Sequence, residues 1–482
     1  MEPKNLLFIL SDQHTREFTG CYGSELVQTP NIDRLAARGT HFDNAYTPCP
    51  ICVPARASLA TGRYVHQIRH WDNAHPYTGE PPGWGQRMVE AGTEVTAIGK
   101  LHYRGVDDPT GWSNQIDTLH VVDGIGDLRG CVRSNMSERN SAAGYAAEAG
   151  RGESPYTRYD ARTTEHAVQW LRQRALSNDE RPWVLFVGFV LPHFPLIAPP
   201  EFYDLYTDVP WPRHYAEEER PTQPVIRDMM KIQGYDRHFD HDRVQVARRA
   251  YFGMVSMMDH CVGRTLEALD ESGLTKQTRV IYTSDHGENL GNRGLWGKSN
   301  MYEESAAVPL VMAGPDIPAG QALGTPVNLV DCYQTILDNG GVPLTDAEEF
   351  DLPGHSLIGI ANGHVPRRTI LSEYHAACST TGFFMIRDEN WKYVHYVGYD
   401  PQLFDLESDP HETVDLGTSP EHADVRARCE KKLRAVVDPE AADEQAFADQ
   451  SVVIERHGGV EAVMAQGDYG YTPAPGEAVR RF

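Results

Sequence analysis

The chain has 482 residues, of which 40% are hydrophobic, and its 68 acidic and 44 basic side chains give a formal net charge of -24. That charge argues against a nucleic-acid partner, because a phosphate backbone requires a basic face. No apolar run approaches the ~20 residues needed to span a bilayer, so no membrane partner is expected.

Residues 5–10 form a short apolar run that is followed by polar residues. The run is too short for the core of a signal peptide and lacks a small-residue cleavage site, so it predicts a buried strand and a cytoplasmic protein. Eight cysteines scattered over the chain do not form a disulfide framework, and we expect them to be reduced. Because the net charge is -24, binding of an anionic substrate would need a local cluster of positive side chains.

The elements that follow alternate between strands and helices. Continuous apolar runs predict buried strands, Thr29-Pro30 predicts a helix start, and apolar residues at helical spacing predict a long amphipathic helix. In chain order these are strand 6–10, helix 31–39, strand 93–99, strand 183–190, helix 244–269, strands 279–283 and 308–312, and helix 328–337. This order predicts an α/β domain with a large, mainly parallel sheet flanked by helices, over residues 1–365.

A smaller α+β domain is predicted over residues 366–440. Residues 383–387 and 391–397 are separated by a short turn and predict an antiparallel hairpin, followed by a helix near 422–436. Residues 441–482 end in a segment rich in Gly and Pro and predict an extended C-terminal arm. An arm lying across this or a neighbouring subunit makes a homo-oligomer the expectation.

Polar stretches follow four of the predicted strands. They are SDQH after Leu10, KLH after Gly99, PHFP just after Val190 and SDHGE after Thr283. Because ligands bind at the carboxyl ends of strands in open α/β sheets, we expect these stretches to converge on one edge.

Cys52 lies in CPICVPARASLATGR and allows several interpretations. With Cys49 it forms a C-x-x-C, as in redox proteins, but the surrounding sequence lacks the compact unit of a thioredoxin. A structural zinc site would need a second ligand pair at suitable spacing, and no second C-x-x-C exists. Two buried structural thiols remain the ordinary alternative.

The surrounding residues favour a different role. Cys52, Pro54, Ala55 and Arg56, followed by Thr61-Gly62, match C-x-P-[SA]-R-x-x-x-x-T-G, and the chain thereby resembles the type I sulfatases of the alkaline phosphatase superfamily. The resemblance implies that Cys52 is oxidised to formylglycine by a maturation enzyme, and that its hydrate is the nucleophile. Pro54 starts a helix whose N–H groups favour an anion, and Arg56 one turn later can pair with sulfate oxygens.

The family's metal site is matched in two places. Asp12-Gln13 follows the first strand, where Gln replaces a second acid as in branches resembling choline sulfatases and phosphonate monoester hydrolases. Asp285-His286 supplies the other half. The resemblance implies one divalent ion held by Asp12, Gln13, Asp285, His286 and the side chain at position 52. Calcium is usual in sulfatases, and the imidazole leaves manganese open.

Further family motifs occur in the expected order. Gly99-Lys100-Leu101-His102, Pro192-His193 and Trp296-Gly297-Lys298 match catalytic segments, Asn73 aligns with an Asn near the nucleophile, and residues 403–412 resemble the C-terminal signature. The resemblance makes Arg56, Lys100, Lys298 and Asn73 substrate-binding, His193 the acid for the leaving alcohol, and His102 the base that restores the aldehyde. Within the family, the chain resembles the choline-sulfatase and phosphonate monoester hydrolase-like branch.

The expected reaction is hydrolysis of a small sulfate monoester, alkyl or aryl, with choline sulfate among the candidates. A phosphonate monoester or phosphodiester hydrolase using the same site is the alternative, although Lys100 and His102 favour sulfate. Glu373-Tyr374-His375 is a candidate for binding a cationic alcohol. The acidic and histidine-rich stretch 236–243 resembles a metal cluster, but it opens the long helix and predicts a solvated loop with an N-cap.

Overall fold

The computed structural model describes residues 2–134, 136–365, 368–468 and 470–481. Within these residues, eight strands form one large sheet. In spatial order they are β11 (Gln321–Leu323), β2 (Gly39–Phe42), β10 (Leu310–Ala313), β9 (Thr278–Ser284), β1 (Asn5–Asp12), β7 (Trp183–Pro192), β4 (Glu94–Lys100) and β5 (Asn114–Leu119). The pairs from β9 through β5 are all parallel, and β10 is antiparallel to both of its neighbours.

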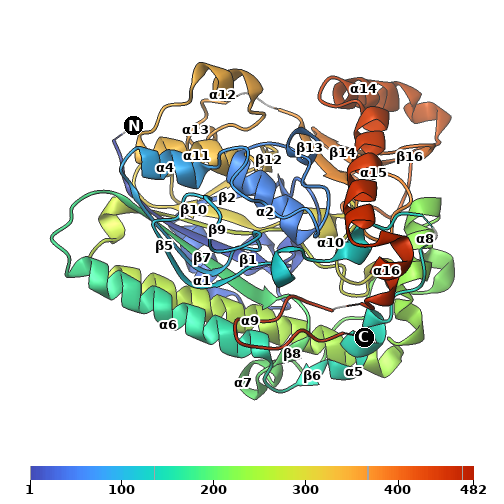
Figure 1. The fold of residues 1–482 in the computed structure, drawn as a ribbon, viewed down its shortest axis with the longest axis horizontal. Helices are drawn as coiled ribbons and strands as arrows, with labels where there is room; N and C mark the ends of the chain where they lie inside the picture. The colour runs from blue at the N-terminus through green and yellow to red at the C-terminus, as the bar shows by residue number, and fades with distance from the viewer. Residues whose placement is uncertain (1, 135, 366–367, 469, 482) are drawn as a thin grey trace.

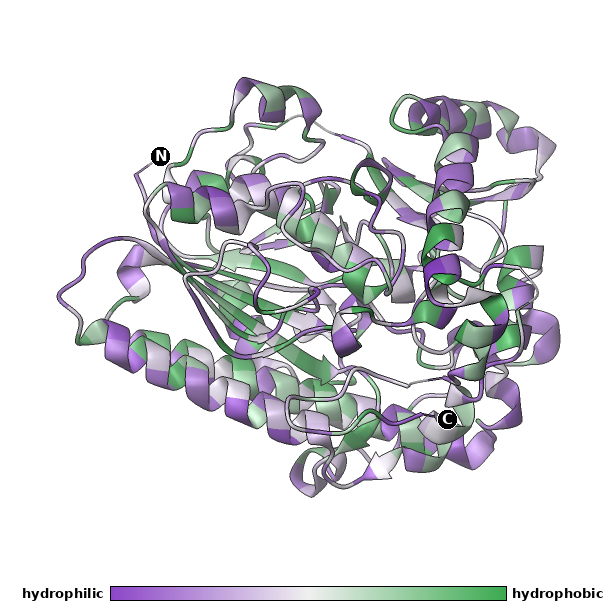
Figure 2. Cartoon of the chain, in the orientation of Figure 1, coloured by the Kyte–Doolittle hydropathy of each residue, from purple (hydrophilic) through white to green (hydrophobic). Residues whose placement is uncertain are grey.

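Helices cover both faces of this sheet (Figure 1). One face carries α1 (Pro30–Ala37), α6 (Pro155–Ala175) and α9 (His241–Glu271). The other carries α2 (Cys52–Thr61), α4 (Trp84–Glu90), α11 (Asp331–Gly340) and α13 (Leu357–Ala361). The central strands β1, β7 and β9 are buried along their whole length, which accounts for their continuous apolar sequences. Figure 2 shows these apolar strands between helices whose outer faces are polar. The predicted α/β fold class is confirmed.

Short elements connect these layers. The strands are β3 (Ala45–Tyr46), β6 (Gly150–Arg151), β8 (Ile197–Ala198) and β12 (Val327–Asn328), and the helices are α3 (Val65–Ile68), α5 (Ser141–Glu148), α7 (Pro200–Tyr203), α8 (Pro224–Gln233), α10 (Glu303–Ala306) and α12 (Asp346–Asp351). No helix in the described part of the chain is long and apolar enough to cross a membrane.

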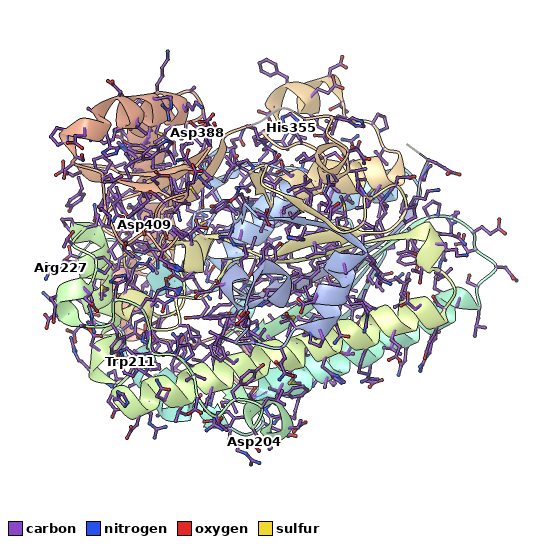
Figure 3. All side chains as sticks on the ribbon, turned by 180° about the vertical axis from the view of Figure 1, so that it is seen from behind. Asp204, Trp211, Arg227, His355, Asp388 and Asp409 are labelled. Carbon is purple, nitrogen blue, oxygen red and sulfur yellow. The ribbon has the colours of Figure 1, made fainter. Side chains whose placement is uncertain are left out.

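Among residues 368–468, four strands form a second, antiparallel sheet. They are β13 (Ile370–Tyr374), β14 (Phe383–Asp388), β15 (Trp391–Tyr396) and β16 (Tyr399–Asp405). The predicted hairpin is β14–β15, and the predicted helix is α14 (Ala423–Arg434). Figure 3 shows Asp388, at the end of β14, far from Asp204, which follows α7 below the main sheet. The predicted boundary between the two domains falls at residues 365 and 366, and residue 366 lies outside the described residues.

The C-terminal segment differs from the sequence prediction over its first half. Residues 441–465 do not form an extended arm but the helices α15 (Pro439–Arg456) and α16 (Gly459–Ala465). Asp438 caps α15 by accepting the N–H of Ala441, and Pro439 occupies the first helical position. The Gly- and Pro-rich composition that predicted an extended arm is confined to the last residues and does not extend to this helical start. After α16 the chain returns toward α5 (Figure 1).

Candidate active site

Cys52 is the first residue of α2, a helix whose ten residues are all buried. The N–H of Val53 in the first turn donates to Asn73 Oδ1 at 3.1 Å, so Asn73 is held against the start of the helix. Burial, and then the negative charge of Asp12, raise the pKa of the Cys52 thiol to about 11. Reactive thiolates have lowered pKa values, so this residue as encoded has the character of a protonated thiol.

Two carboxylates and an imidazole surround this thiol. Asp12 ends β1 and Asp285 follows β9, two neighbouring parallel strands in which Ser11 pairs with Ser284. His286 Nε2 lies 3.2 Å from Cys52 Sγ, 3.7 Å from Asp12 Oδ1 and 3.6 Å from Asp285 Oδ1. The predicted convergence of these stretches on one sheet edge is therefore present, because the parallel pairing brings the ends of β1 and β9 together.

The four side chains of Asp12, Cys52, Asp285 and His286 fit a divalent ion. Their ligand atoms all lie within 4.8 Å of one another, and all four residues are buried. Ligands of one ion are separated by about 3–4 Å, and two carboxylate oxygens with one imidazole suit a hard or borderline divalent metal. The donor set is compatible with calcium and with manganese.

Arg56 has a different environment from the predicted one. Its Nε donates to Asp285 Oδ2 at 2.8 Å, one Nη to the Lys100 backbone oxygen at 2.9 Å and the other to Asp12 Oδ2 at 3.4 Å. It is also not among the residues that line the pocket described below. In the structure the Arg56 guanidinium holds the two carboxylates in place, and its pairing with substrate oxygens stays a prediction.

Lys100, at the end of β4, pairs with Asp12 Oδ2, and both residues are almost completely buried. Burial by itself would raise the pKa of Asp12, but the charges of Lys100, His193 and Arg56 outweigh it and hold that pKa well below its ordinary value. Asp12 therefore stays ionised and available to a cation. Lys100 also lines the pocket.

Gln13 and Lys298 meet beside this group. Lys298 Nζ donates to Gln13 Oε1, and Gln13 Nε2 donates to Glu288. The backbone N–H of Gln13 donates to Asp285 Oδ1 at 3.2 Å. Glu288 also accepts the N–H groups of Leu290 and Gly297 and so holds the loop that carries Lys298. The side-chain oxygen of Gln13 is thus engaged by Lys298, and its role as a metal ligand stays a prediction.

His102 and His193 face the pocket from the segments that follow β4 and β7. His102 Nε2 hydrogen-bonds Thr472 Oγ1 at 2.9 Å, and its buried Nδ1 has no hydrogen-bond partner among the described residues. His193 Nδ1 donates to the Phe194 carbonyl at 2.9 Å, which leaves Nε2 for other contacts. Burial, together with Lys100 for His102 and Lys298 for His193, lowers both pKa values well below the ordinary histidine value.

Backbone strain occurs at two of these positions. Gln13 has φ 70° and His102 has φ 63°, in the left-handed region. A residue with a side chain adopts this conformation at a cost of about 1–3 kcal/mol, and such strain gathers at functional sites. The two side chains thus take directions that an ordinary strand end would not give them.

A pocket of about 140 Å³ opens above Cys52. Its inner wall contains the predicted residues Cys52, Asn73, Lys100, His102, His193 and Lys298. Although the whole chain carries a charge of -24, two lysines face this cavity. The local positive cluster that an anionic substrate requires is therefore present.

The rest of the lining forms an outer wall and consists mostly of residues outside the sequence motifs, although Phe194 belongs to PHFP and Trp296 to Trp296-Gly297-Lys298. Aromatic side chains form much of it, with Asp127 and Arg139 beside them: Tyr145, Tyr156, Phe194, Tyr235, Trp296 and Tyr471. Arg139 pairs with Asp127 at 3.2 Å. Thr472, Tyr471 and Gly470 reach this wall from the C-terminal segment. Apart from Phe194 and Trp296, no local pattern marks these residues, because they come together only through tertiary contacts.

Two other predictions concern residues outside the pocket. Glu373, Tyr374 and His375 do not line it; the Glu373 carboxylate instead binds His66 Nδ1 at 2.9 Å and His375 Nε2 at 3.1 Å. The structure therefore places these three residues outside the pocket that would hold the alcohol. Asp240 in the stretch 236–243 accepts the N–H of Arg243 and caps α9, as predicted.

Comparison with known proteins gave consistent matches. The family profile described as Sulfatase matches residues 4–342, and the profile described as N-sulphoglucosamine sulphohydrolase, C-terminal, matches residues 291–438. The choline-sulfatase of Rhizobium meliloti (strain 1021) is 34% identical over 431 residues, covering 86% of this chain and 83% of that protein. Arylsulfatase K of Bos taurus is 30% identical over 461 residues, covering 90% and 81%.

Solved structures share the fold. The phosphonate monoester hydrolase of Agrobacterium radiobacter superposes with a TM-score of 0.74 at 24% identity, covering 90% of this chain and 95% of that one. A protein solved in complex with its substrate D-glucosamine-2-N,6-O-disulfate gives a TM-score of 0.70 at 22% identity, covering 93% and 99%. At these identities the likeness concerns the fold alone.

Proposed function

The chain belongs to the sulfatase family and is a sulfuric ester hydrolase, and from this premise we propose that it acts through a formylglycine derived from Cys52 and one divalent ion. The observation that carries the proposal is the convergence of Asp12, Asp285 and His286 on Cys52 Sγ at the floor of a cationic pocket. The raised pKa of the thiol supports it, because an unmodified Cys52 would be a poor nucleophile at neutral pH.

A divalent ion and an aldehyde at position 52 would supply two kinds of chemistry. A divalent ion held by Asp12, Asp285, His286 and the side chain at position 52, with Gln13 beside them, would be Ca²⁺ or Mn²⁺ and would lower the pKa of the attacking oxygen. A hydrated aldehyde at position 52 would supply a nucleophile that can release itself after sulfuryl transfer. A maturation enzyme that oxidises Cys52 is the partner this implies.

The protein's own cations act on the sulfate group. Lys100 and Lys298 face the cavity and would bind the nonbridging oxygens, whose charge they offset in the transition state. The Asn73 amide oxygen is occupied by the Val53 N–H, so its NH₂ group is the part left to donate to substrate. Arg56 would hold Asp12 and Asp285 in the orientation that the metal requires.

The two histidines would move the protons. His193 donates its Nδ1 proton to a carbonyl, so Nε2 is the atom that would protonate the departing alcohol. His102 would accept a proton at Nδ1, since Nε2 is held by Thr472. An anionic ester in the pocket would raise both lowered histidine pKa values toward the working pH, because a nearby opposite charge favours the charged imidazole.

The leaving group would be small, because the cavity measures about 140 Å³. Its aromatic outer wall with Asp127 suits either an aryl ring or a cationic alkyl alcohol such as choline, which aromatic faces and a carboxylate attract. The name of the 34% identical relative agrees with choline sulfate. We propose choline sulfate and simple aryl sulfates as the first substrates to compare.

The decisive experiment combines mass spectrometry with kinetics. After expression with a formylglycine-generating enzyme, the peptide containing residue 52 should carry an aldehyde, and Cys52→Ala should lose at least 10³-fold in kcat/KM, on the order expected for loss of a nucleophile. Cys49→Ser is the matched control, because Cys49 is also a buried free thiol, and it should remain active. Full activity with an unmodified thiol at position 52 would refute the mechanism, and loss of activity in Cys49→Ser as well as in Cys52→Ala would favour a dithiol mechanism.

A phosphonate monoester or phosphodiester hydrolase is the second candidate. Gln13 in place of an acid and His286 in the metal group are compatible with it, since relatives of that branch also carry these residues, and a solved hydrolase of this kind shares the fold. Lys100 and His102, both in the pocket wall, favour sulfate. The ratio of kcat/KM for a sulfate monoester and a phosphodiester with the same leaving group decides between them.

We further propose a cytoplasmic location and a homo-oligomer. Size-exclusion chromatography with light scattering tests the second: a mass of about 54 kDa, that of a single chain, would contradict it.

A further inference from the structure

A second group of metal-binding side chains lies outside the active site. Asp72 Oδ1 is 2.9 Å from His75 Nδ1 and 3.5 Å from Cys131 Sγ, and the three ligand atoms all lie within 4.8 Å of one another. Asp72 and His75 belong to the loop after α3, and Cys131 ends the 3₁₀ helix Leu128–Cys131. The chain thus brings a carboxylate, an imidazole and a thiol to one point from two distant segments.

The carboxylate at the centre of this group is completely buried, and its counter-charge is incomplete. Among the described residues, the ion-pair partner of Asp72 is His75, which is charged only when protonated. Gln450 Nε2 donates to Asp72 Oδ2 at 2.8 Å and the Ala74 N–H donates to Oδ1 at 2.8 Å. These donors are neutral, so the buried negative charge has a cationic partner only while His75 is protonated.

An unpartnered polar atom lies in the same network. Gln450, in α15, is 1% exposed, and its Oε1 has no hydrogen-bond partner among the described residues. Its Nε2 is fixed by Asp72 and by the His375 carbonyl at 2.7 Å, so the amide has a defined orientation. A buried acceptor without a donor beside a buried carboxylate points to a positive or water-binding group at this place.

The separations fit one kind of ion. Oxygen, nitrogen and sulfur ligands of a tetrahedral zinc lie about 3.3–3.6 Å apart, which the 3.5 Å contact from Asp72 to Cys131 matches and the 2.9 Å contact to His75 approaches. Calcium and magnesium prefer oxygen ligands, so a thiol and an imidazole disfavour them. A thiolate and a carboxylate together also cancel the charge of a divalent ion, and a neutral site can be buried.

We propose that Asp72, His75 and Cys131 bind a zinc ion that is separate from the catalytic metal. Binding requires the thiolate and the neutral imidazole with its proton on Nε2, so the thiol proton is released to solvent. A water molecule fills the fourth position on the side of His75, whose side chain is 15% exposed. Without the ion, burial and the charge of Asp72 raise the pKa of the Cys131 thiol well above its ordinary value, so it stays protonated.

The ion would stiffen the wall of the substrate pocket. Asn73 follows Asp72 directly, lines the pocket and accepts the Val53 N–H at the start of α2. Asp127, which immediately precedes the helix ending in Cys131, lines the same pocket and donates its N–H to the Asn73 carbonyl at 3.3 Å. A bond from each segment to one zinc would lock these two wall residues together.

The test uses the full chain in a Cys52→Ala background, which removes the thiol at the catalytic metal group. The protein is loaded with Zn²⁺, passed over a desalting column and assayed for bound metal by mass spectrometry. Adding Cys131→Ala or His75→Gln should remove one molar equivalent of zinc. Adding Cys332→Ala, a buried thiol in the main core, should remove none.

Cobalt provides an independent readout. Co²⁺ in the Cys52→Ala protein should give a thiolate-to-metal charge-transfer band, which disappears with Cys131→Ala and persists with Cys332→Ala. Near-ultraviolet circular dichroism monitors folding, and the partly exposed His75 gives a second variant if Cys131→Ala unfolds. Equal zinc content in all variants, or a cobalt spectrum without the band, would overturn the proposal and leave a hydrogen-bonded cluster only.

Discussion

Replacement of Arg56 by Met tests how the active site keeps two carboxylates buried. The change removes the 2.8 Å hydrogen bond to Asp285, the 3.4 Å contact to Asp12 and the bond to the Lys100 carbonyl, while the aliphatic volume is roughly retained. Asp12 keeps Lys100, but Asp285 loses its guanidinium partner. Removing one member of a buried pair costs about 3–5 kcal/mol, because the other charge is left without compensation.

A matched control is present in the same protein. Arg63 Nε also donates to a carboxylate oxygen at 2.8 Å, that of Asp351, but the Asp351 side chain is 52% exposed while that of Asp285 is 0% exposed. Arg63→Met should therefore lower the free energy of unfolding by at most about 1 kcal/mol. Urea unfolding of both variants, followed by tryptophan fluorescence, compares two ion pairs of equal length that differ in burial.

Metal addition separates the electrostatic explanation from simple loss of packing. A divalent ion at Asp12 and Asp285 would supply the positive charge that Arg56→Met removes, so saturating Ca²⁺ or Mn²⁺ should stabilise this variant more than the wild type. The Arg63→Met protein should respond as the wild type does. Equal destabilisation of the two variants, or an Arg56→Met protein indifferent to metal, would show that the guanidinium does not hold the carboxylates as described.

Two further predictions concern neighbouring polar groups. Burial raises the pKa of Asp160 to about 7, although its carboxylate accepts the Val190 and Leu191 N–H groups. The folded state therefore binds more protons than the unfolded state between about pH 4 and 7. The stability of the folded state consequently falls as the pH rises through this window. Asp160→Asn should remove this pH-dependent part of the free energy of unfolding, which is about 4 kcal/mol at its limit. In thermal unfolding, the variant should therefore gain stability relative to the wild type from pH 5.5 to 8.5. A stability difference between the two proteins that does not change with pH would contradict the assignment. Thr472→Val should remove the hydrogen-bond partner of His102 Nε2. In steady-state kinetics, kcat should fall about 10-fold with KM little changed. An unchanged kcat would show that Thr472 does not orient the imidazole.

Much of the main fold was predictable because apolar runs and helical spacing are visible in short stretches of the sequence. The apolar runs of β1, β7 and β9 can be buried only in the centre of a sheet covered on both faces, and the helical spacing in α9 persists over many turns. The helices α15 and α16 were not predicted, because the Gly- and Pro-rich composition of the last residues was extended to the whole segment although Asp438-Pro439 is a helix start. The antiparallel direction of β10 was also not predictable, since a short apolar run carries no information about its direction.

The sequence by itself determined the residue types of the site and their order along the chain: a cysteine in its signature, two acids, two lysines and three histidines, most of them just after predicted strands. Tertiary structure decided what each side chain touches. Parallel pairing of β1 with β9 brings Asp12 and Asp285 together, Arg56 turns to these acids instead of the cavity, and Thr472 reaches His102 from 370 residues away. Whether a segment forms a strand depends on the hydrophobic pattern of neighbouring residues, which can be read from a short stretch of sequence. Contacts between these side chains depend on how distant segments pack together, and no short stretch of sequence determines that packing.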